Sequence, residues 1–451
     1  MDVALKGRQN VVFCRTYGAL RFLLTGSRRG GASRLRLATF CHTCGPLRLR
    51  LARKERNSSR LVKDEIRVYL SLVVCWRRLI PFSTEASLFV SDLETPAVVI
   101  DLDVMERNLS RMAEYARSQN LRLRPHTKSH KIPELAKRQL DHGAHGITVA
   151  KIGEAEVMLE AGITDMLIAY PIVGTAKAGK LADLATRAAI TVALDSVDAA
   201  RSISQEARGR DVQIGVLVEL DVGFRRCGIA NEDELLSVVQ QVVDLPGLEF
   251  KGLMFFPGNH QVPEKERAEL RVGVNGFLGR AVSTLEGAGI AVPVVSGGST
   301  PTARECHLFS GVNEIRPGMY IFNDRNMVGV GIAAVEDCAL SVIATVVSTS
   351  VSGRAIVDGG SKTFSSDRHQ AGDGKGFGMI KNDPDADLEQ LSEEHGHLNI
   401  ARSTHRYHVG ERLAIIPNHV CSTINMHNQV YGVRGERVET VWEVAGRGKV
   451  R

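Results

Sequence analysis

The sequence predicts an α/β fold, in which a closed (β/α)8 barrel of the TIM type precedes a mainly β carboxyl-terminal domain. Strand-like runs alternate with helical segments between about residues 95 and 330, which is the pattern of a parallel barrel. Beyond residue 335 the helical periodicity stops and alternating runs dominate. A doubly wound open sheet is the alternative, and the number of strands disfavours it. We therefore expect a basic leader at 1–90, a barrel at 91–335 and a β domain at 336–451.

The leader has the composition of a mitochondrial or chloroplast transit peptide. Residues 1–80 hold 18 Lys and Arg but only 4 Asp and Glu. An extension upstream of the true start and a basic surface arm are the alternatives, and we expect little order in this segment. The expected location is cytoplasmic, or mitochondrial or chloroplast if the leader is a working transit peptide.

Charge and hydropathy argue against two classes of partner. The formal net charge of +6 arises in the leader, because the remainder holds 39 basic and 47 acidic residues. Such a body offers no basic face for nucleic acid. No uninterrupted apolar run reaches the roughly 18 residues that a membrane span needs, so we expect no membrane partner. The scattered cysteines of the body predict no disulfide framework and therefore a reducing compartment.

The elements follow from periodicity. A first strand is expected at Pro96–Leu102, and Asp103 is expected to cap a helix that runs to about Gln119. The barrel strands are expected at Leu121–Arg124, Gly146–Ala150, Met166–Ala169, Ile190–Leu194, Gln213–Leu220, Glu249–Phe256, Val292–Ser296 and Glu314–Ile321. Helices are expected at Gly153–Ala161, Val197–Ala207, Glu232–Val243 and Glu264–Ala288. Because such barrels place their chemistry at the carboxyl ends of the strands, the residues there are the first candidates for a site.

Lys128 is the candidate nucleophile. It stands in Arg124-Pro125-His126-Thr127-Lys128-Ser129-His130-Lys131, just past a strand and among other cations. Nearby positive charge disfavours the ammonium form, so more free amine is available to form a Schiff base. The alternative is a solvated basic turn that opens the helix Ile132–Leu140.

Ser296-Gly297-Gly298-Ser299-Thr300 is a candidate phosphate site, because it follows the seventh barrel strand. Glycines let the backbone approach an anion, and N–H groups and hydroxyls donate to it. An ordinary Gly-Ser turn is the alternative. A phosphate anchor across the barrel mouth from Lys128 suggests pyridoxal phosphate. Arg226 could then face the pyridine nitrogen and keep it unprotonated, the alternative being a solvated pair with Arg225.

The last domain is expected to be rich in strands, at Ala339–Ser348, Arg354–Val357, Arg412–Ile416, Gln429–Tyr431 and Arg437–Glu443. Asp383–Glu394 is interpreted as an acidic, solvated surface insertion. His419 and Cys421 are expected to project from one face of a strand as a metal-binding pair. Two protein ligands leave positions open for water or substrate, which suits a catalytic metal, and core packing is the alternative. His427 and the His395/His397 pair could complete or flank such a site.

Seven segments in this order resemble the D-serine dehydratase/D-threonine aldolase family of fold-type III pyridoxal-phosphate enzymes, which are related to alanine racemase. They are RPHTKSHK, DVGFRRCG, SGGSTPT, EIRPGMYIFND, VDGGSKTFSSD, LSEEHGH and PNHVC. The resemblance covers about residues 92–445. It implies that the first strand joins the second domain and that the protein is a head-to-tail homodimer. One departure is Phe255-Phe256, which stands where some members have a tyrosine near the cofactor.

The resemblance also implies roles for individual residues. Lys128 would form the Schiff base with pyridoxal phosphate, and Ser296–Thr300 with Tyr320 would help to hold the cofactor. His419 and Cys421 fall on the family's metal pair, for which Zn²⁺, or another dication such as Mn²⁺ or Mg²⁺, is expected.

The function implied is that of a lyase acting on a D-β-hydroxy amino acid. His-x-Cys at the metal pair is similar to D-serine dehydratases, which convert D-serine to pyruvate and ammonia. D-threonine aldolase, which releases glycine and an aldehyde, is the alternative, with His126 as a candidate base. A non-catalytic pyridoxal-phosphate-binding protein and a racemase are remoter alternatives, against which the β domain and the metal pair argue.

Overall fold

The computed structural model describes residues 88–258, 264–370 and 375–451, together with the backbone of four strands in the first 41 residues. The chain divides into two units, Met1–Glu85 and Ala86–Arg451. In the first unit an antiparallel sheet contains, in chain order, β1 (Val3–Leu5), β2 (Gln9–Thr16), β3 (Ala19–Gly26) and β4 (Ala38–Cys41). The rest of the leader lies outside the described residues. Its expected lack of order and its targeting role therefore stay predictions.

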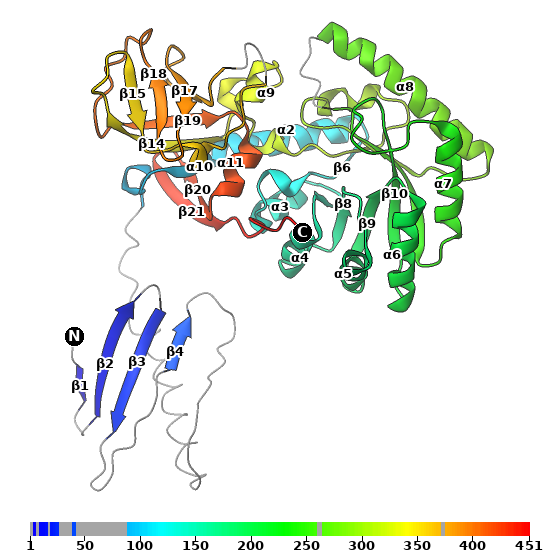
Figure 1. Ribbon diagram of the computed structural model, residues 1–451, viewed down its shortest axis with the longest axis horizontal. Coiled ribbons are helices and arrows are strands. Elements are labelled where there is room, and N and C mark those ends of the chain that lie inside the picture. The colour runs from blue at the N-terminus through cyan, green and yellow to red at the C-terminus, as the bar shows by residue number, and fades with distance from the viewer. Residues whose placement is uncertain are drawn as a thin grey trace. The chain divides into compact units, whose positions relative to one another are not determined.

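Eight parallel strands form the barrel of the second unit (Figure 1). Their order is β6-β13-β12-β11-β10-β9-β8-β7, and a parallel bridge between His126 and Thr148 closes the ring. The strands are β6 (Arg122–Leu123), β7 (Ile147–Val149), β8 (Asp165–Ile168), β9 (Ala189–Leu194), β10 (Ile214–Leu220), β11 (Leu248–Phe255), β12 (Val294–Gly297) and β13 (Glu314–Ile315). The predicted barrel is confirmed. The last predicted strand, Glu314–Ile321, is wrong beyond Ile315, because Pro317 cannot donate to a ladder and the 3-10 turn η4 (Met319–Ile321) follows.

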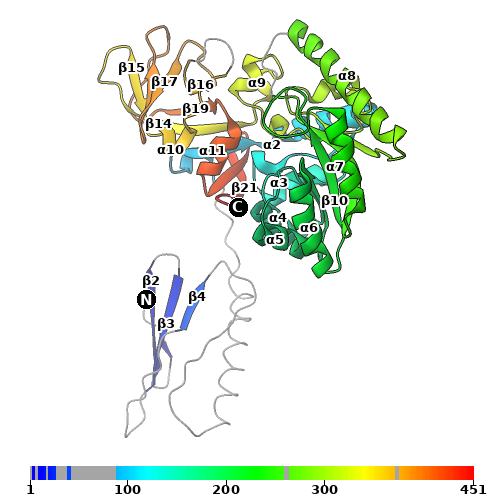
Figure 2. The ribbon, with the colours of Figure 1, turned by 45° about the vertical axis from the view of Figure 1, so that its right-hand side comes forward.

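Helices cover the outside of the barrel, and Figures 1 and 2 show α4 to α7 side by side around the strands. They are α2 (Leu102–Ser118), α3 (Pro133–Asp141), α4 (Ile152–Glu160), α5 (Thr175–Ala185), α6 (Val197–Gly209), α7 (Glu232–Asp244) and α8 (Glu264–Gly287). Asp101, and not the predicted Asp103, caps α2, because its carboxylate accepts the Val104 N–H at 3.1 Å. In the described part of the chain, no helix is both long and apolar enough to cross a membrane.

The second sheet forms the carboxyl-terminal domain. Its order is β15-β18-β17-β16-β19-β14-β5-β20-β21, and β15 also pairs with β14, so six of its strands close into an antiparallel barrel. The strands are β5 (Ala97–Asp101), β14 (Leu340–Ser348), β15 (Arg354–Val357), β16 (Gly378–Ile380), β17 (Asp387–Leu391), β18 (Gly396–Asn399), β19 (Arg412–Pro417), β20 (Gln429–Arg434) and β21 (Arg437–Glu443). β5 pairs with β14 and β20, which confirms that the first strand joins the second domain.

The interpretation of Asp383–Glu394 as a solvated insertion is wrong. This segment contains β17, which pairs with β16 and β18, and its Leu388 is fully buried. The acidic residues that suggested an insertion lie around the buried Ala386 and Leu388, and pairing with neighbouring strands supplies the order that the composition did not predict.

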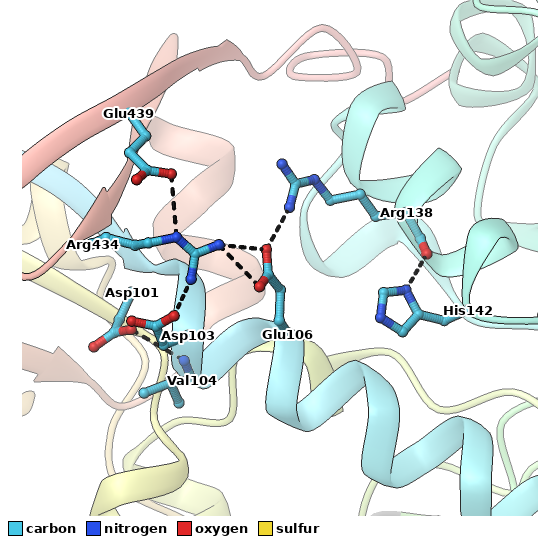
Figure 3. A network of polar contacts seen from close by, with 8 residues as sticks. All are labelled: Asp101, Asp103, Val104, Glu106, Arg138, His142, Arg434 and Glu439. Atoms are coloured by element: carbon cyan, nitrogen blue, oxygen red, sulfur yellow. Dashed lines mark hydrogen bonds and ion pairs between the residues drawn. The ribbon is translucent and has the colours of Figure 1, made fainter.

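A charged network fastens the β domain to the barrel helices (Figure 3). Arg434 on β20 donates to both carboxylate oxygens of Glu106 on α2 at 3.0 Å, and also binds Asp103 and Glu439. Glu106 in turn accepts from Arg138 on α3 at 2.9 Å. Exposed ion pairs of this kind are worth little singly, but they join the last sheet to the helix that follows β5 and to the helix that follows the Lys128 turn.

Candidate active site

Lys128 lies on the 3-10 turn η2 (Thr127–Ser129), beyond the carboxyl end of β6. The turn is tied to both neighbouring strands, because the His126 N–H donates to the Pro317 carbonyl at 3.0 Å and the Thr127 hydroxyl donates to the Thr148 carbonyl at 3.1 Å. Thr127 and Ser129 are buried, whereas Lys128 keeps exposed surface although protein atoms surround it on most sides. Lys128 is therefore an exposed side chain on an otherwise buried turn.

The surroundings of Lys128 favour the neutral form of its amine. Burial lowers its pKa below the ordinary value of 10.5, and the guanidinium groups of Arg226 and Arg316 lower it further. Cys421 and Glu154 act in the opposite direction without reversing the shift. A lowered pKa increases the share of free amine, which is the form that condenses with an aldehyde.

The two other lysines of this region have partners that Lys128 lacks. The Lys131 Nζ lies 2.8 Å from a carboxylate oxygen of Glu154, and the Lys151 ammonium lies 3.2 Å from the centroid of the Tyr170 ring. No ion pair with a carboxylate is seen for Lys128 among the described residues. The structure therefore separates one reactive candidate from two lysines with structural contacts.

His126 is held in place as a neutral ring. Burial, followed by the charges of Lys128 and Arg316, lowers its pKa well below 6.5. Its Nδ1 accepts the backbone N–H of Lys128 at 3.4 Å, and the ring also hydrogen-bonds the backbone of Thr148. Both contacts shape the Lys128 turn. The role of His126 as a base is still a prediction.

The predicted phosphate loop follows β12 and depends on its two glycines. Gly298 has φ +85°, and a Cβ on Gly297 or Gly298 would overlap the Phe255 ring or the Cys306 sulfur, respectively. Ser299 and Thr300 are buried, and the Ser299 N–H donates to the Thr302 hydroxyl at 3.0 Å. The loop is thus a tight turn with two buried hydroxyls.

The phosphate loop and the Lys128 turn meet through Gly318. Its N–H donates to the Thr300 hydroxyl at 3.2 Å, and a Cβ built on it would come within 2.6 Å of the Ser129 Oγ. The predicted phosphate loop therefore lies next to the turn that carries Lys128. These residues fit a molecule that carries both an anionic group and an aldehyde, as pyridoxal phosphate does.

The structure places the Tyr320 hydroxyl against α3. Its buried hydroxyl accepts from the Gln139 amide at 3.2 Å, and burial raises the pKa of the phenol. Tyr320 also lines a cavity of about 190 Å³, together with Thr300, Asn108 and Asp337, and Lys128 does not line this cavity. Its predicted contact with the cofactor stays a prediction.

Sequence reasoning missed Arg316, the third residue of EIRPGM. The buried guanidinium donates to the Ser296 hydroxyl at 2.5 Å and to the Phe255 carbonyl at 2.8 Å. Ser296 in turn donates to a Glu314 carboxylate oxygen at 2.7 Å. A single arginine before Pro-Gly carries no pattern that predicts such a position, since only the closed barrel brings it to Lys128.

Arg226 lies at the mouth of the barrel, after β10. Its guanidinium lies 3.5 Å from the Glu219 carboxylate and 4.7 Å from the centroid of the Phe256 ring, and half of its side chain is exposed. Phe256 packs edge-on against Phe224 with the ring centroids 5.1 Å apart. Arg226 is therefore neither a freely solvated loop residue nor fully buried, and its positive charge lowers the pKa of Lys128.

His419 and Cys421 lie beside the Lys128 turn of the same chain. The predicted strand position is wrong, because β19 ends at Pro417 and His419 precedes the helix α11 (Val420–Met426). The two side chains still hydrogen-bond each other, and the Cys421 Sγ is hydrogen-bonded to the Ser129 Oγ at 3.6 Å.

The pair has the chemistry of a metal-binding site. Burial opposes ionisation of both groups, but His419 and Lys128 lower the pKa of the Cys421 thiol. Cys421, Asp324 and Asp367 raise the pKa of His419 to about 9. A sulfur and an imidazole in contact fit a divalent metal that displaces protons on binding.

The other histidines named from the sequence have different partners. The His427 Nε2 hydrogen-bonds the Thr363 carbonyl at 3.1 Å, and the His397 Nε2 hydrogen-bonds the Ser392 hydroxyl at 3.0 Å. In the part of the chain that the structure describes, no three His, Cys, Asp or Glu side chains form a ready-made metal cluster. The pair would therefore leave coordination positions to water or substrate.

Two domain families match the chain in succession. "Alanine racemase, N-terminal domain" matches residues 100–326, and "Putative serine dehydratase domain" matches residues 339–433. The chain is 36% identical to a D-threonine aldolase of Arthrobacter sp, over 79% of this chain and 93% of that protein. It is 36% identical to a D-threo-3-hydroxyaspartate dehydratase of Delftia sp. (strain HT23), over 73% and 92%. A D-serine dehydratase of Dictyostelium discoideum is 27% identical over 77% and 95%.

Solved structures of similarly named enzymes superpose on this chain. A D-threonine aldolase from Filomicrobium marinum superposes with a TM-score of 0.76 at 35% identity, over 81% of this chain and 99% of that chain. The D-threo-3-hydroxyaspartate dehydratase from Delftia sp. HT23 superposes with a TM-score of 0.73 at 34% identity, over 79% and 98%. Variants of that dehydratase replace a histidine or the cysteine two positions later by alanine, and the cysteine variant is described as metal-free.

Proposed function

Because this chain belongs to the family that joins an alanine racemase N-terminal domain to a serine dehydratase domain, we propose that it is a pyridoxal-phosphate-dependent lyase acting on D-3-hydroxy amino acids. Within this class we propose dehydration, of D-serine to pyruvate and ammonia, as the reaction. The observation that carries the proposal is the position of His419 and Cys421 beside the Lys128 turn.

Lys128 has two tasks in this proposal. Pyridoxal phosphate, when bound, supplies an aldehyde that condenses with a primary amine and a ring that accepts the electron pair of a bond broken at Cα. Lys128 would hold the aldehyde end, and Ser299, Thr300 and the Gly318 region would hold the phosphate end. Once substrate is bound, the free amine of Lys128 would remove the Cα proton, for which its lowered pKa suits it.

His419 and Cys421 would hold a dication, with zinc as the expected metal. A metal there would supply Lewis acidity to the β-hydroxyl of the substrate. Support comes from the Delftia dehydratase, whose replaced histidine and cysteine have the same two-residue spacing. Arg226 and Arg316 would hold positive charge near the cofactor ring.

Aldol cleavage is the second candidate, favoured by the names of two relatives. In that reaction a base must take the proton of the β-hydroxyl, and His126 is the nearby imidazole. Its lowered pKa makes it a weak base, and its ring nitrogens already contact the backbone of Lys128 and Thr148, so we place dehydration first.

A substrate panel tests the proposal. Purified holoenzyme is given D-serine or D-threonine, and 2-oxo acid, ammonia and glycine are measured. We expect pyruvate and ammonia from D-serine. The rate should fall at least tenfold after chelation or in Cys421→Ala, and it should recover when zinc is returned to the chelated wild type. The visible absorbance of the cofactor should be unchanged in the chelated protein and in the variant. Glycine from D-threonine without any 2-oxo acid would reject dehydration, and full turnover without metal would reject the role of the pair.

A further inference from the structure

We propose that Asp367 is a positioning residue that orients the imidazole of His419 toward a metal ion bound with Cys421. Asp367 is the last residue of VDGGSKTFSSD, a segment that the proposed reaction leaves without a role. The inference rests on the proposed metal site, and it assigns Asp367 a place behind the histidine ligand, outside the coordination sphere.

The geometry places the Asp367 carboxylate near the Nδ1 atom of the His419 ring. The Asp367 Oδ2 lies 3.9 Å from the His419 Nδ1, and 40% of the Asp367 side chain is exposed. An imidazole whose Nδ1–H points to a carboxylate presents its Nε2 to a metal, because the partner fixes both the tautomer and the ring orientation. A small closing movement on metal binding would convert this contact into a hydrogen bond.

Residues on both sides of the metal pair hold Asp367 in this place. The Ser422 hydroxyl donates to the Asp367 Oδ2 at 2.5 Å, and the Asn418 amide donates to the Asp367 carbonyl at 2.9 Å. Asn418 directly precedes His419, and Ser422 directly follows Cys421. The segment that carries Asp367 and the loop that carries the ligands are therefore fixed to each other at both ends of the loop.

The segment before Asp367 is fastened in the same way. The Thr423 hydroxyl on α11 donates to the Phe364 carbonyl at 3.1 Å. Ser365 is buried with φ +71°, a left-handed conformation that is costly for serine, and its hydroxyl accepts the Asp367 N–H at 3.2 Å. Such a conformation persists where surrounding contacts over-determine it, so the position of Asp367 is built into the fold.

The other carboxylate near His419, that of Asp324, accepts hydrogen bonds from the backbone. Asp324 is fully buried, and its two oxygens accept the N–H groups of Met327 at 3.0 Å and Val420 at 3.2 Å. It stabilises the starts of α9 (Arg325–Gly329) and α11. Asp367 is thus the carboxylate of the two whose side chain is directed at the imidazole.

Zinc binding to full-length protein tests this role. The metal-free holoenzyme and its variants are titrated with zinc alone against a competing chelator, while visible absorbance reports the cofactor and Tm reports folding. Asp367→Asn is expected to bind one zinc per chain about 10–100-fold more weakly, with unchanged absorbance and an unchanged metal-free Tm. Ser422→Ala should weaken binding less, and Asp367→Glu should restore part of the affinity.

The controls separate this inference from the proposed function. Asp385→Asn alters an exposed aspartate of the same domain and should bind zinc like wild type, whereas His419→Ala should lose binding. Wild-type affinity in Asp367→Asn, with binding lost in His419→Ala, would overturn this inference and leave the proposed function intact. Loss in Asp367→Asn as complete as in His419→Ala would make Asp367 a ligand and overturn the positioning role. Wild-type affinity in His419→Ala would overturn both.

Discussion

At the scale of single residues, the neighbours of each lysine distinguish Lys128 from the other lysines near the candidate site. Lys131 and Lys151 follow Lys128 within one short region, yet Glu154 and the Tyr170 ring engage them. Lys128 instead faces Arg316 and Arg226, whose charges favour its neutral form. The sequence shows several neighbouring cations, and only the structure shows that, among the described residues, Lys128 has neither a carboxylate partner like that of Lys131 nor an aromatic one like that of Lys151.

Replacement of Lys128 by alanine should abolish the visible absorbance of the bound cofactor, because no amine would remain to condense with its aldehyde. Turnover should fall by at least about a thousandfold, as is usual when a covalent nucleophile is removed. Absorption spectra and rates of purified protein check this. Lys137→Ala, on the exposed face of α3, is the matched control and should keep the wild-type spectrum. A wild-type spectrum in Lys128→Ala would falsify the assignment.

Alkaline pH should destabilise the fold through buried thiols. Burial raises the pKa of Cys306 and of Cys338 to about 12, whereas both thiols ionise near 9 in the unfolded chain. The folded state then binds more protons than the unfolded state between these values, so this stability is fully present below pH 9 and is lost as pH rises toward 12. Each thiol contributes a slope of about 1.4 kcal/mol per pH unit.

Urea unfolding between pH 8 and 10.5 measures this slope. Cys306→Ser keeps a hydroxyl that can bond the Thr302 carbonyl, as the thiol does, but removes the ionisable group. Its free energy of unfolding should fall less steeply with pH than that of wild type, because unfolding of the variant releases about one proton fewer in this pH range. Parallel curves for the two proteins would contradict the assignment.

At the scale of elements, short turns at strand ends carry the chemistry. η2 presents Lys128, the turn after β12 presents buried hydroxyls, and the start of α11 presents His419 and Cys421. The sequence predicted the strands that end at the first two turns, but it extended the strand before Tyr320 and placed the metal pair on a strand. Both errors fall where a proline ends the extended conformation and a helical turn follows.

Gly298→Ala should weaken cofactor binding. Gly298 has φ +85°, and an added Cβ would overlap the Cys306 sulfur, so the phosphate loop must shift. We expect a loss of about tenfold or more in affinity for pyridoxal phosphate, measured by absorbance titration of the cofactor-free protein. Gly289→Ala is the matched control, because its φ is +78° while no atom lies within 4 Å of the added Cβ. Wild-type affinity in Gly298→Ala would contradict the role of the loop, and an equal loss in Gly289→Ala would show that the effect is not specific to the loop.

At the scale of the whole molecule, the site lies where the two domains of the second unit meet. The barrel supplies Lys128 and the phosphate loop, and the β domain supplies His419 and Cys421. β5 precedes the barrel in sequence but pairs with β14 and β20 of the β domain, so the chain crosses between the domains before and after the barrel. This double connection and the Arg434 network limit how far the metal pair can move from the amine (Figure 3).

Deletion of residues 1–85 should leave the enzyme intact, because Ala86–Arg451 contains every element of the barrel and the β domain. The shortened chain should keep the cofactor spectrum, a rate within about twofold of wild type, and its zinc affinity. Its isoelectric point should fall, since the leader carries the excess of basic residues. A loss of cofactor binding in the shortened chain would assign the leader a role in the site.

The sequence predicted the barrel, the β domain and several turns, because apolar periodicity and strand-end composition are local signals. It did not predict β16 to β18, which are short strands that depend on pairing with their neighbours. It also missed Arg316 and Asp367, which lie in segments that carry the family resemblance but are not singled out within them by any pattern. Both acquire a role only through contacts with distant segments.

By itself the sequence determined which residue types are available for chemistry and on which ends of which strands most of them stand. The tertiary structure decided which of them meet. Ser129 and Cys421 are 292 positions apart and yet hydrogen-bonded, since β5, α2 and β14 bring the β domain against the Lys128 turn. The physical reason is that periodicity reports which face of an element is buried, whereas the partner of a buried face depends on the packing of the whole chain.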